Sequence, residues 1–368
     1  MILPKDFKMQ IFTGVIVVDS QNSGLWRSAI AHSKTNSARV IAATEYFSPY
    51  ALARDIIQTG PQYIIFSWRP AFDAIMFADR PSGVVRSTPA SIFLLIPDHV
   101  GLDFISDEEQ ERILASDGLL VTSEILKKEY LEHYKVENIQ ILHDLPDFAQ
   151  IDEIKSRSIS RKINKIIWVG NSAWGKRLGY KDHKGLHRFF LPAMQILKSI
   201  DESLEFEVID SARKKLPHEE VLHSIQESSC LVITSDSEGT CLPMLEAAAL
   251  GTPVVTFDVG IANELLRGQL RSQISKRELS ILIELILNTL SNSESVSKVI
   301  TSRIDQFRQE IEVELANLKI PRGTDGKWRS SKQKYSRRQS LSWKLRWVRN
   351  SYVNFLSKVS HRIFASSP

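Results

Sequence analysis

The most constraining feature of the sequence is a pair of short apolar segments, residues 230–234 and 253–257, on either side of one helical stretch. Both segments have the apolar, β-branched composition of buried strands. The stretch between them, residues 244–250, reads Met-Leu-Glu-Ala-Ala-Ala-Leu, and the Gly251 and Pro253 that follow are typical of a helix end. A strand, a helix and a second strand in this order predict one unit of a parallel α/β sheet.

Two glutamates of this unit, separated by seven residues, are candidates for ligand binding. Glu246 lies among apolar helical neighbours, where a carboxylate is costly unless a partner pairs with it. Glu238 lies in the loop between the first strand and the helix, which is where open α/β sheets hold their ligands. The alternatives are a buried Glu246 paired with a structural cation, and a Glu238 on an ordinary surface loop.

Residues 235–264 resemble the nucleotide-sugar signature of retaining GT-B glycosyltransferases of the family 4, group 1 type. That signature reads S-x-x-E-G, a short mixed stretch, E-A-x-A-x-G-x-P-V-V, then a glycine turn and a further glutamate. The matching residues are Ser235, Glu238, Gly239, Glu246, Ala247, Ala249, Gly251, Pro253, Val254, Val255, Gly260 and Glu264. The whole string is far more specific than a single pair of glutamates, for which the alternative is an ordinary Rossmann-like βαβ unit.

The resemblance implies an α/β fold of the GT-B type, with two Rossmann-like domains of doubly wound parallel sheet that face each other across a cleft. It also implies transfer of a hexose from a nucleotide-diphosphate sugar to a glycan or lipid-linked acceptor, with retention at the anomeric carbon. No cofactor or metal is expected, since no D-x-D pair follows a strand and no zinc-ligand spacing occurs. Two other functions stay open: a nucleotide-sugar 2-epimerase, and a catalytically silent GT-B scaffold in polysaccharide assembly.

A chain of 368 residues is long enough for two domains, and its strand-like segments form two series. The first series lies at residues 11–18, 39–43, 63–67, 92–96, 118–122 and 139–143, with helical patterns between. The second lies at residues 165–170, 205–209, 230–234 and 253–257. We predict an N-terminal acceptor domain at residues 1–150, a linker at 151–163, a nucleotide-sugar domain at 164–320 and a basic tail at 321–368.

By resemblance, Glu238 contacts the donor sugar and Glu246 binds the ribose hydroxyls, because carboxylates accept hydrogen bonds from hydroxyl pairs. Backbone N–H groups at the helix start suit the diphosphate, and Gly239 lets the backbone approach closely. These N–H groups belong to Gly239, Thr240, Cys241 and Leu242. Lys184, followed by Gly185, matches the family's K-G pair and provides a cation for the departing diphosphate.

A second cation that the family usually carries is missing. Family members read V-G-R after the first strand of the second domain, whereas here Gly170 is followed by Asn171. The loop from Asn171 to Lys184 is also longer than in the family. It contains Lys176 and Arg177, which either replace the missing charge at the donor or are solvated loop residues.

The N-terminal domain offers two further candidates. His99 follows the strand at residues 92–96, and family members often carry a histidine near the donor sugar at this strand end. The alternative is a structural histidine that is hydrogen-bonded at the strand end. Gly24, in the loop after the first strand, matches the family's glycine loop only loosely.

Composition and charge bear on the compartment and on the partners. The two cysteines form no disulfide framework, which favours a reducing cytoplasm, and no apolar run approaches the ~20 residues of a spanning helix. The apolar stretch at residues 11–18 is predicted to be a core strand rather than a signal peptide. Residues 321–368 carry twelve Lys or Arg and one acid, so the net charge of +4 comes from this tail.

The tail contains an amphipathic, tryptophan-bearing basic helix pattern at residues 341–364. Such a pattern suits the surface of an anionic membrane, which would make the protein peripheral on the inner face of the cytoplasmic membrane. The alternative is a helix that packs back on the N-terminal domain. Binding to nucleic acid is the least favoured interpretation of the basic run.

Overall fold

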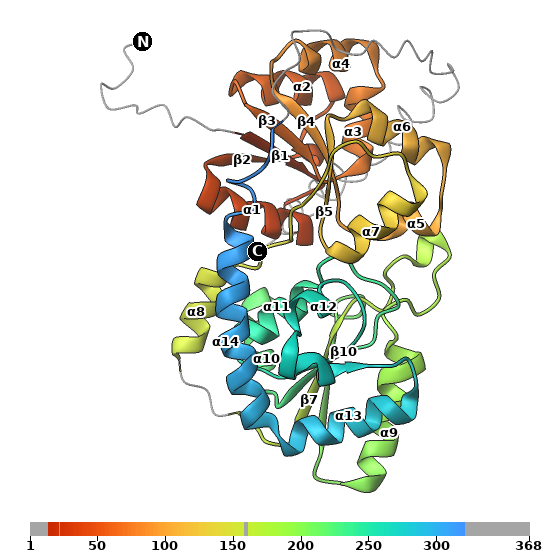
Figure 1. Cartoon of the computed structure of the whole chain (residues 1–368), viewed down its shortest axis with the longest axis vertical. Coiled ribbons are helices and arrows are strands. Elements are labelled where there is room, and N and C mark those ends of the chain that lie inside the picture. The colour runs from red at the N-terminus through yellow and green to blue at the C-terminus, as the bar shows by residue number, and fades with distance from the viewer. Residues whose placement is uncertain (1–13, 22, 158–160, 321–368) are drawn as a thin grey trace, which may run out of the picture.

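The computed structural model describes residues 14–21, 23–157 and 161–320, which form two α/β domains joined along one side (Figure 1). The N-terminal domain contains a six-stranded sheet and the C-terminal domain a five-stranded sheet, and all strand pairs are parallel. The fold class expected from the alternation of strands and helices is therefore confirmed.

The N-terminal sheet consists of β1 (Gly14–Val18), β2 (Ala38–Ala42), β3 (Tyr63–Phe66), β4 (Ser91–Ile96), β5 (Gly118–Val121) and β6 (Ile139–Ile141). Its helices are α1 (Gly24–Asn36), α2 (Pro49–Gln58), α3 (Arg69–Met76), α4 (Asp79–Arg86), α5 (Val100–Asp103), α6 (Asp107–Ala115) and α7 (Glu124–His133). The strand order is β2-β1-β3-β4-β5-β6, so the direction of chain winding reverses between β1 and β3.

The C-terminal sheet consists of β7 (Lys165–Gly170), β8 (Glu205–Asp210), β9 (Cys230–Ile233), β10 (Val254–Phe257) and β11 (Ile274–Ser275). Its helices are α8 (Phe148–Ser156), α9 (Leu191–Ile200), α10 (His218–Glu227), α11 (Leu242–Ala249), α12 (Ala262–Leu265), α13 (Leu279–Ser291) and α14 (Ser293–Glu312). The order β11-β10-β9-β7-β8 repeats that of the first sheet, and its reversal lies between β7 and β9.

The strands predicted from apolar runs agree with the structure to within one or two residues where they can be compared. The N-cap of α7 is Ser123. Ser123 accepts a hydrogen bond from the backbone N–H of Leu126. A π-helical turn, Leu186–Phe190, directly precedes α9. The reason is local, because the Asp182 carboxylate accepts hydrogen bonds from the N–H groups of His187 and Arg188 and so fixes the first turn.

Part of the predicted linker is helical. Helix α8 buries Phe148, Ile151 and Ile154 in the core of the C-terminal domain. The chain also returns after α14, where Leu315 joins the core of the N-terminal domain. The domains are therefore connected twice, and the exact boundaries between them stay a prediction.

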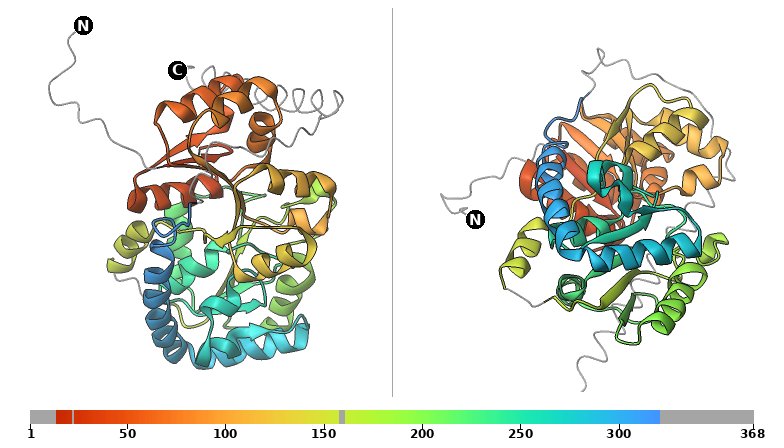
Figure 2. Two further views of the ribbon diagram at one scale, coloured as in Figure 1. Left: turned by 45° about the horizontal axis from the view of Figure 1, so that its top comes forward. Right: turned by 60° about the horizontal axis from the view of Figure 1, so that its bottom comes forward.

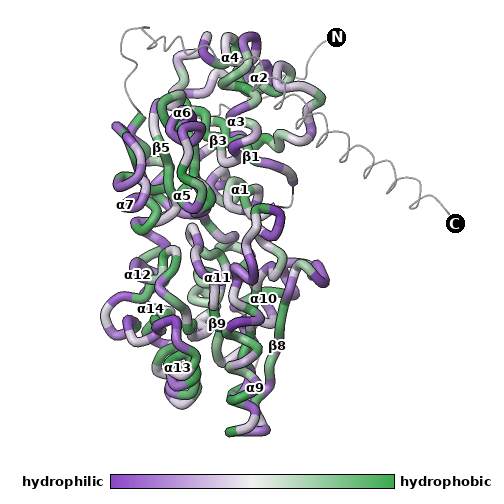
Figure 3. The backbone as a smooth tube through the Cα atoms, turned by 90° about the vertical axis from the view of Figure 1, so that its right-hand side faces the viewer, coloured by the Kyte–Doolittle hydropathy of each residue, from purple (hydrophilic) through white to green (hydrophobic). Residues whose placement is uncertain are grey.

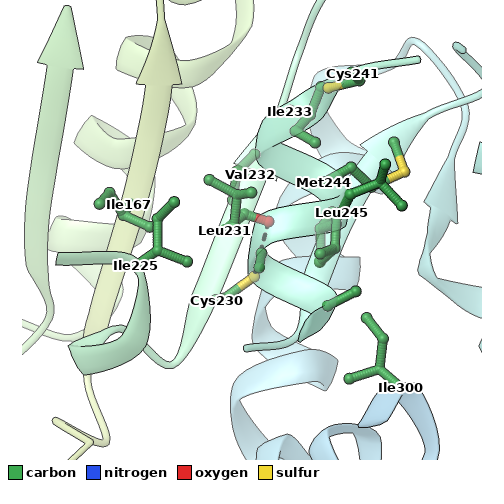
Figure 4. Close-up of a cluster of buried hydrophobic side chains, with 14 of the residues drawn as sticks. Ile167, Ile225, Cys230, Leu231, Val232, Ile233, Cys241, Met244, Leu245 and Ile300 are labelled. Atoms are coloured by element: carbon green, nitrogen blue, oxygen red, sulfur yellow. Dashed lines mark hydrogen bonds between the residues drawn. The ribbon is translucent and has the colours of Figure 1, made fainter. Parts of the chain in front are cut away.

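Each sheet is covered by helices that bury apolar side chains against it. Helix α13 shows both hydrophobic and hydrophilic stretches in the tube view, as expected for a covering helix (Figure 3). Around β9, the apolar side chains of α11 pack onto the strand and position the loop between them (Figure 4). Two further views show how helices flank both sheets (Figure 2).

Within the described ranges, no helix is long and apolar enough to cross a membrane. The basic tail at residues 321–368, with the helix predicted at 341–364, lies outside the described residues, as does the first part of the strand predicted at 11–18.

Candidate active site

Lys184, Glu238 and Gly239 lie in the loops that follow β7 and β9, at the point where the winding of the C-terminal sheet reverses. The loop after β9 carries Glu238 and Gly239, and it touches the N-terminal domain. A Cβ atom on Gly239 would lie 2.0 Å from the Pro97 carbonyl oxygen and 2.6 Å from the Thr122 hydroxyl oxygen. Only glycine fits here, so this loop lies directly at the boundary between the domains.

Glu238 and Lys184 form an ion pair at the centre of this region. The Lys184 ammonium donates to Glu238 Oε1 at 2.5 Å, and the Ser235 hydroxyl donates to the same oxygen at 2.5 Å. Both charged side chains are largely removed from solvent, with 16% of Lys184 and 14% of Glu238 exposed. A charge-assisted hydrogen bond of this kind holds both groups in defined positions.

The Lys184-Gly185 pair is fixed to the end of β9 through its backbone. Gly185 has φ +67°, and a Cβ atom there would lie 2.0 Å from the Thr234 carbonyl oxygen. The Thr234 hydroxyl donates to the Lys184 carbonyl at 2.8 Å and accepts from the indole N–H of Trp168 at 3.1 Å. The glycine is needed for both its conformation and its close approach, which explains the K-G pattern in physical terms.

Glu246 is buried on α11, and its partner is a histidine. The imidazole Nε2 of His218, at the start of α10, lies 2.8 Å from Glu246 Oε1. The other ring nitrogen of His218 lies 3.2 Å from the side-chain oxygen of Gln150 on α8. The sequence predicted a paired carboxylate here, and the structure identifies the pairing residue.

The end of the loop before α11 and the first residue of this helix present several unbonded N–H groups. The backbone N–H groups of Gly239, Thr240, Cys241 and Leu242 donate to no other part of the chain that the structure describes. Cys241, the N-cap, has φ +69°, a conformation that costs a non-glycine residue about 1–3 kcal/mol. Unbonded N–H groups at a helix start form a site for an anion.

The side chain of Thr240 forms hydrogen bonds at the boundary between the domains. Its hydroxyl donates to the Thr122 carbonyl at 3.0 Å and accepts from the N–H of Asp144 at 3.0 Å. Because the hydroxyl is used in these two bonds, only the backbone N–H of Thr240 is available to a ligand.

The loop between β7 and α9 carries the basic residues that could replace the missing cation at the donor. Asn171, directly after Gly170, closes a turn by accepting from the N–H groups of Ala173 and Trp174. Lys176 and Arg177 lie exposed in the 3₁₀ turn Lys176–Leu178 and form no ion pair with any described residue. Their role, and that of Gly170 and Asn171, in binding the donor stays a prediction.

An aromatic side chain of the same loop, Trp174, lies over Lys184. The ammonium of Lys184 lies 5.3 Å from the ring centre of Trp174, and the Trp174 ring lies 4.4 Å from that of His183. Burial, together with the neighbouring Lys184 charge, lowers the pKa of His183, whose Nε2 lies 3.1 Å from the Ser237 carbonyl oxygen. A neutral His183 adds no charge beside the ion pair, so Lys184 remains the principal cation there.

Of the two N-terminal candidates, His99 follows its predicted strand, whereas Gly24 lies in a helix and not in the loop after the first strand. His99 is buried after β4, its Nε2 lies 3.3 Å from a Glu129 carboxylate oxygen, and its Nδ1 has no partner among the described residues. Gly24 is the first residue of α1, which Ser23 caps. Because a Cβ atom on Gly24 would meet nothing within 4 Å, packing does not require glycine there. The donor roles of both residues stay predictions.

Comparison with known proteins agrees with the resemblance. Residues 197–298 match the family model of glycosyl transferases group 1. The structure is similar to that of S. aureus TarM, with 14% sequence identity, a TM-score of 0.55 and coverage of 73% of this chain and 57% of TarM. The fold is GT-B.

Two other solved GT-B structures are similar over almost their whole length. Sucrose-phosphate synthase from Thermosynechococcus elongatus is 11% identical with a TM-score of 0.56, covering 83% of this chain and 98% of that one. Anabaena HepE, solved with UDP and glucose, is 12% identical with a TM-score of 0.54, covering 83% of this chain and 100% of that one. No curated protein matches the sequence. The family match and the GT-B fold together support a glycosyltransferase.

In this GT-B structure, the last glutamate of the motif lies at the domain boundary rather than beside Glu238. Glu264 accepts from the backbone N–H of Glu124 at 2.9 Å and pairs with His143 Nε2 at 2.9 Å. The Nδ1 atom of His143 lies 2.7 Å from Glu314 Oε1. Burial opposes protonation, but hydrogen bonds to Glu264 and Glu314 outweigh it and raise the pKa of His143 to about 9. The His143 imidazolium, hydrogen-bonded through both ring nitrogens, therefore links the two GT-B domains.

Sequence reasoning also missed an ion-pair cluster beside the glutamate loop. Asp236 pairs with Arg277, whose Nη1 lies 2.9 Å from Asp236 Oδ1, and with Arg188. Both arginines are polar residues of ordinary sequence context, so no signal identified them. The part of the chain that the structure describes contains no group of three His, Cys, Asp or Glu side chains able to hold a metal ion. Metal independence stays an expectation.

Proposed function

We propose that the protein is a retaining glycosyltransferase that moves a hexose from a nucleotide-diphosphate sugar to a glycan or lipid-linked acceptor. The observation that carries this proposal is the Lys184–Glu238 pair at 2.5 Å, adjacent to the unbonded N–H groups at the start of α11. Together they provide a cation, a hydroxyl acceptor and an anion-binding helix start within one loop cluster.

Each group has one task in the proposed reaction. Breaking the glycosidic bond adds one negative charge to the departing nucleoside diphosphate, which Lys184 and the N–H groups of Gly239, Thr240, Cys241 and Leu242 stabilise. Glu238 turns from Lys184 to accept hydrogen bonds from the hydroxyls of the donor sugar. The acceptor hydroxyl attacks the anomeric carbon from the face that the diphosphate leaves, and its proton passes to the departing phosphate oxygen.

Glu246 is proposed to bind the ribose, with His218 as a positioning residue. The His218–Gln150 contact fixes the imidazole, and the imidazole in turn fixes the Glu246 carboxylate. Such an outer hydrogen bond keeps a ligand-binding carboxylate oriented before the ligand arrives. His99 of the N-terminal domain, whose Nδ1 has no partner among the described residues, is proposed to approach the donor sugar.

A structurally similar protein supports the choice of a nucleotide-diphosphate sugar as donor. Anabaena HepE has been solved in complex with UDP-glucose, at 12% identity to this chain and a TM-score of 0.51. The base and the sugar of this chain's own donor are open to direct test. The expected location is the cytoplasm, with peripheral contact to the inner face of the membrane.

The proposal is tested by incubating the protein with UDP-, GDP- and ADP-hexoses and an acceptor panel, and by following product and anomeric configuration by NMR. We expect transfer with retention by the wild type and none by Glu238→Ala. The matched control is Glu202→Ala, an exposed glutamate in the loop before β8, which should leave the rate unchanged. Donor alone, incubated without acceptor, distinguishes an epimerase, and equal rates for Glu238→Ala and wild type would refute the assignment.

A further inference from the structure

Two loops from different domains bring exposed apolar side chains together near the candidate active site. Phe104 and Ile105, between α5 and α6, are 50% and 57% exposed, and Leu178, in the loop after β7, is 50% exposed. We call these three residues the apolar tip. In Figure 1 the lime loop after β7 rises to the gold helix α5. Tyr180 joins the two loops, since its ring centre lies 5.8 Å from that of Phe104 and its hydroxyl donates to Asp103.

The loop that the C-terminal domain contributes to this surface is basic. Lys176, Arg177 and Lys181 are exposed on the same loop as Leu178, and none of them forms an ion pair with a described residue. The turn that carries them is bounded by Gly175 and Gly179, which have φ +69° and +95°. These positive φ angles let the chain make a tight turn at which the basic side chains and Leu178 stand outward.

The exposed acids near the apolar tip lie on its N-terminal half. Asp103 accepts from Tyr180, and Asp107 and Glu108 begin α6, whose N-cap Ser106 follows Ile105. Glu108 also lies 3.6 Å from Arg112. Charge is therefore divided across the surface, with unpaired cations on the loop after β7 and acids that are bonded or placed at a helix start on the other side.

A single exposed apolar side chain needs no explanation, but three that converge from two domains beside unpaired cations do. Leucine and aromatic residues interleaved with Lys and Arg are the composition of segments that lie in the interface of an anionic bilayer. The sequence from Lys176 to Lys181 reads Lys-Arg-Leu-Gly-Tyr-Lys, which has this composition. Each cation near an anionic lipid surface adds to binding, and the effect is reduced by salt.

We propose that the apolar tip, together with Lys176, Arg177 and Lys181, docks on the surface of an anionic membrane. The consequence for the acceptor rests on the proposed function. The Trp174 ring lies 5.5 Å from the Tyr180 ring and 5.3 Å from the Lys184 ammonium, so docking here places the ion pair of Lys184 next to the lipid headgroups. An acceptor at that position is linked to a lipid, and its transferable hydroxyl reaches the site from the membrane side.

The docking is tested with fluorescent labels on the full-length protein. The native Cys230 and Cys241 are buried, so Ile105→Cys and Leu178→Cys can be labelled selectively with an environment-sensitive dye. The matched control is Ile200→Cys, which is 60% exposed at the end of α9 in the other part of the C-terminal domain. Labelled proteins are mixed with vesicles of phosphatidylcholine alone or with added phosphatidylglycerol, and brominated lipids report insertion.

We expect the emission of dyes at positions 105 and 178 to rise several-fold with the anionic vesicles only, and to be quenched by brominated lipid. The dye at position 200 should not respond. Replacing Lys176, Arg177 and Lys181 by Glu should abolish the response of the dye at position 178, whereas the same change at the exposed Lys214 and Lys215 should preserve it.

Three outcomes would overturn the proposal. The protein could sediment with vesicles while the dyes at positions 105 and 178 stay unchanged, which would assign membrane binding to the tail at residues 321–368. The dyes could respond equally to neutral vesicles, or they could respond to protein concentration without vesicles, which would show that a second copy covers the apolar tip. The fluorescence measurement needs neither donor nor acceptor. A failed transfer assay would therefore refute the lipid-linked acceptor but would leave the docking result unchanged.

Discussion

Replacing His143 by glutamine should remove a pH-dependent part of the stability of the protein. In the wild type the imidazolium lies between the carboxylates of Glu264 and Glu314, one on α12 and one after α14. All three side chains are mostly buried. Glutamine preserves a neutral hydrogen-bonding group but leaves the two carboxylates without a charged partner.

The size of the effect follows from the pKa of His143, which rises from 6.5 to about 9 in the folded protein. That shift corresponds to about 3 kcal/mol of unfolding free energy. Because the pKa is higher in the folded state, the stabilisation is complete below pH 6.5 and is lost as the pH rises through 9. Wild type and variant should therefore differ by about 3 kcal/mol more at pH 6.5 than at pH 10.

The titration of neighbouring groups does not mask the stability change expected for His143 above pH 7. Burial lowers the pKa of His32, whose Nε2 lies 2.8 Å from the His143 carbonyl oxygen, to about 4. Burial raises the pKa of Asp144 to about 6. Above pH 7 both groups have completed their titration, so the change between pH 7 and 10 belongs mainly to His143.

The assay is urea denaturation followed by tryptophan fluorescence at a series of pH values, with the free energies of variant and wild type subtracted. His133→Gln, an exposed histidine at the end of α7, is the matched control and should show a small difference that is the same at every pH. A difference for His143→Gln that stays constant between pH 6.5 and 10 would show that the imidazolium does not tie the domains together.

Four further substitutions have defined outcomes. Glu238→Gln should lower kcat by about a hundredfold with little change in Tm, measured by NMR transfer assay and calorimetry, since it removes the charge that binds the donor sugar. Glu246→Ala should raise the donor KM about tenfold, about 1.4 kcal/mol, with kcat nearly constant, and His218→Ala should act in the same direction but less; an unchanged KM in both would remove the ribose role. Gly239→Ala should lower Tm by several degrees, because its methyl group would lie 2.0 Å from a carbonyl oxygen of the N-terminal domain and must push the domains apart; Gly83→Ala, where nothing lies within 4 Å, should not.

Much of the fold could be predicted because its strands are buried on both faces. Segments such as residues 92–96 and 165–170 are continuous apolar runs, and a parallel sheet covered by helices requires that pattern. The motif around Glu238 and Glu246 also predicted which strand end carries the candidate site. The π-helical turn before α9 could not be predicted, because an aspartate three residues before Gly185 fixes it through hydrogen bonds that no periodicity indicates.

The partners within the site depend on contacts between distant segments, which the sequence does not encode locally. A paired Glu246 was expected from the cost of burying its charge, but His218 is 28 residues away on another helix. The same holds for His143, which meets Glu264 and Glu314 at separations of 121 and 171 residues. Only docking of the two domains creates that group, and so its raised pKa could not be predicted from the sequence.

Calorimetric titration of the full-length protein with UDP-, GDP- and ADP-hexoses shows directly whether the loops after β7 and β9 bind a nucleotide sugar. We expect saturable binding of one such donor at a single site, weakened in Glu246→Ala and lost when Lys184 and Glu238 are both replaced by alanine. Binding of none of these donors by the wild type, or equal binding by all variants, would contradict this expectation.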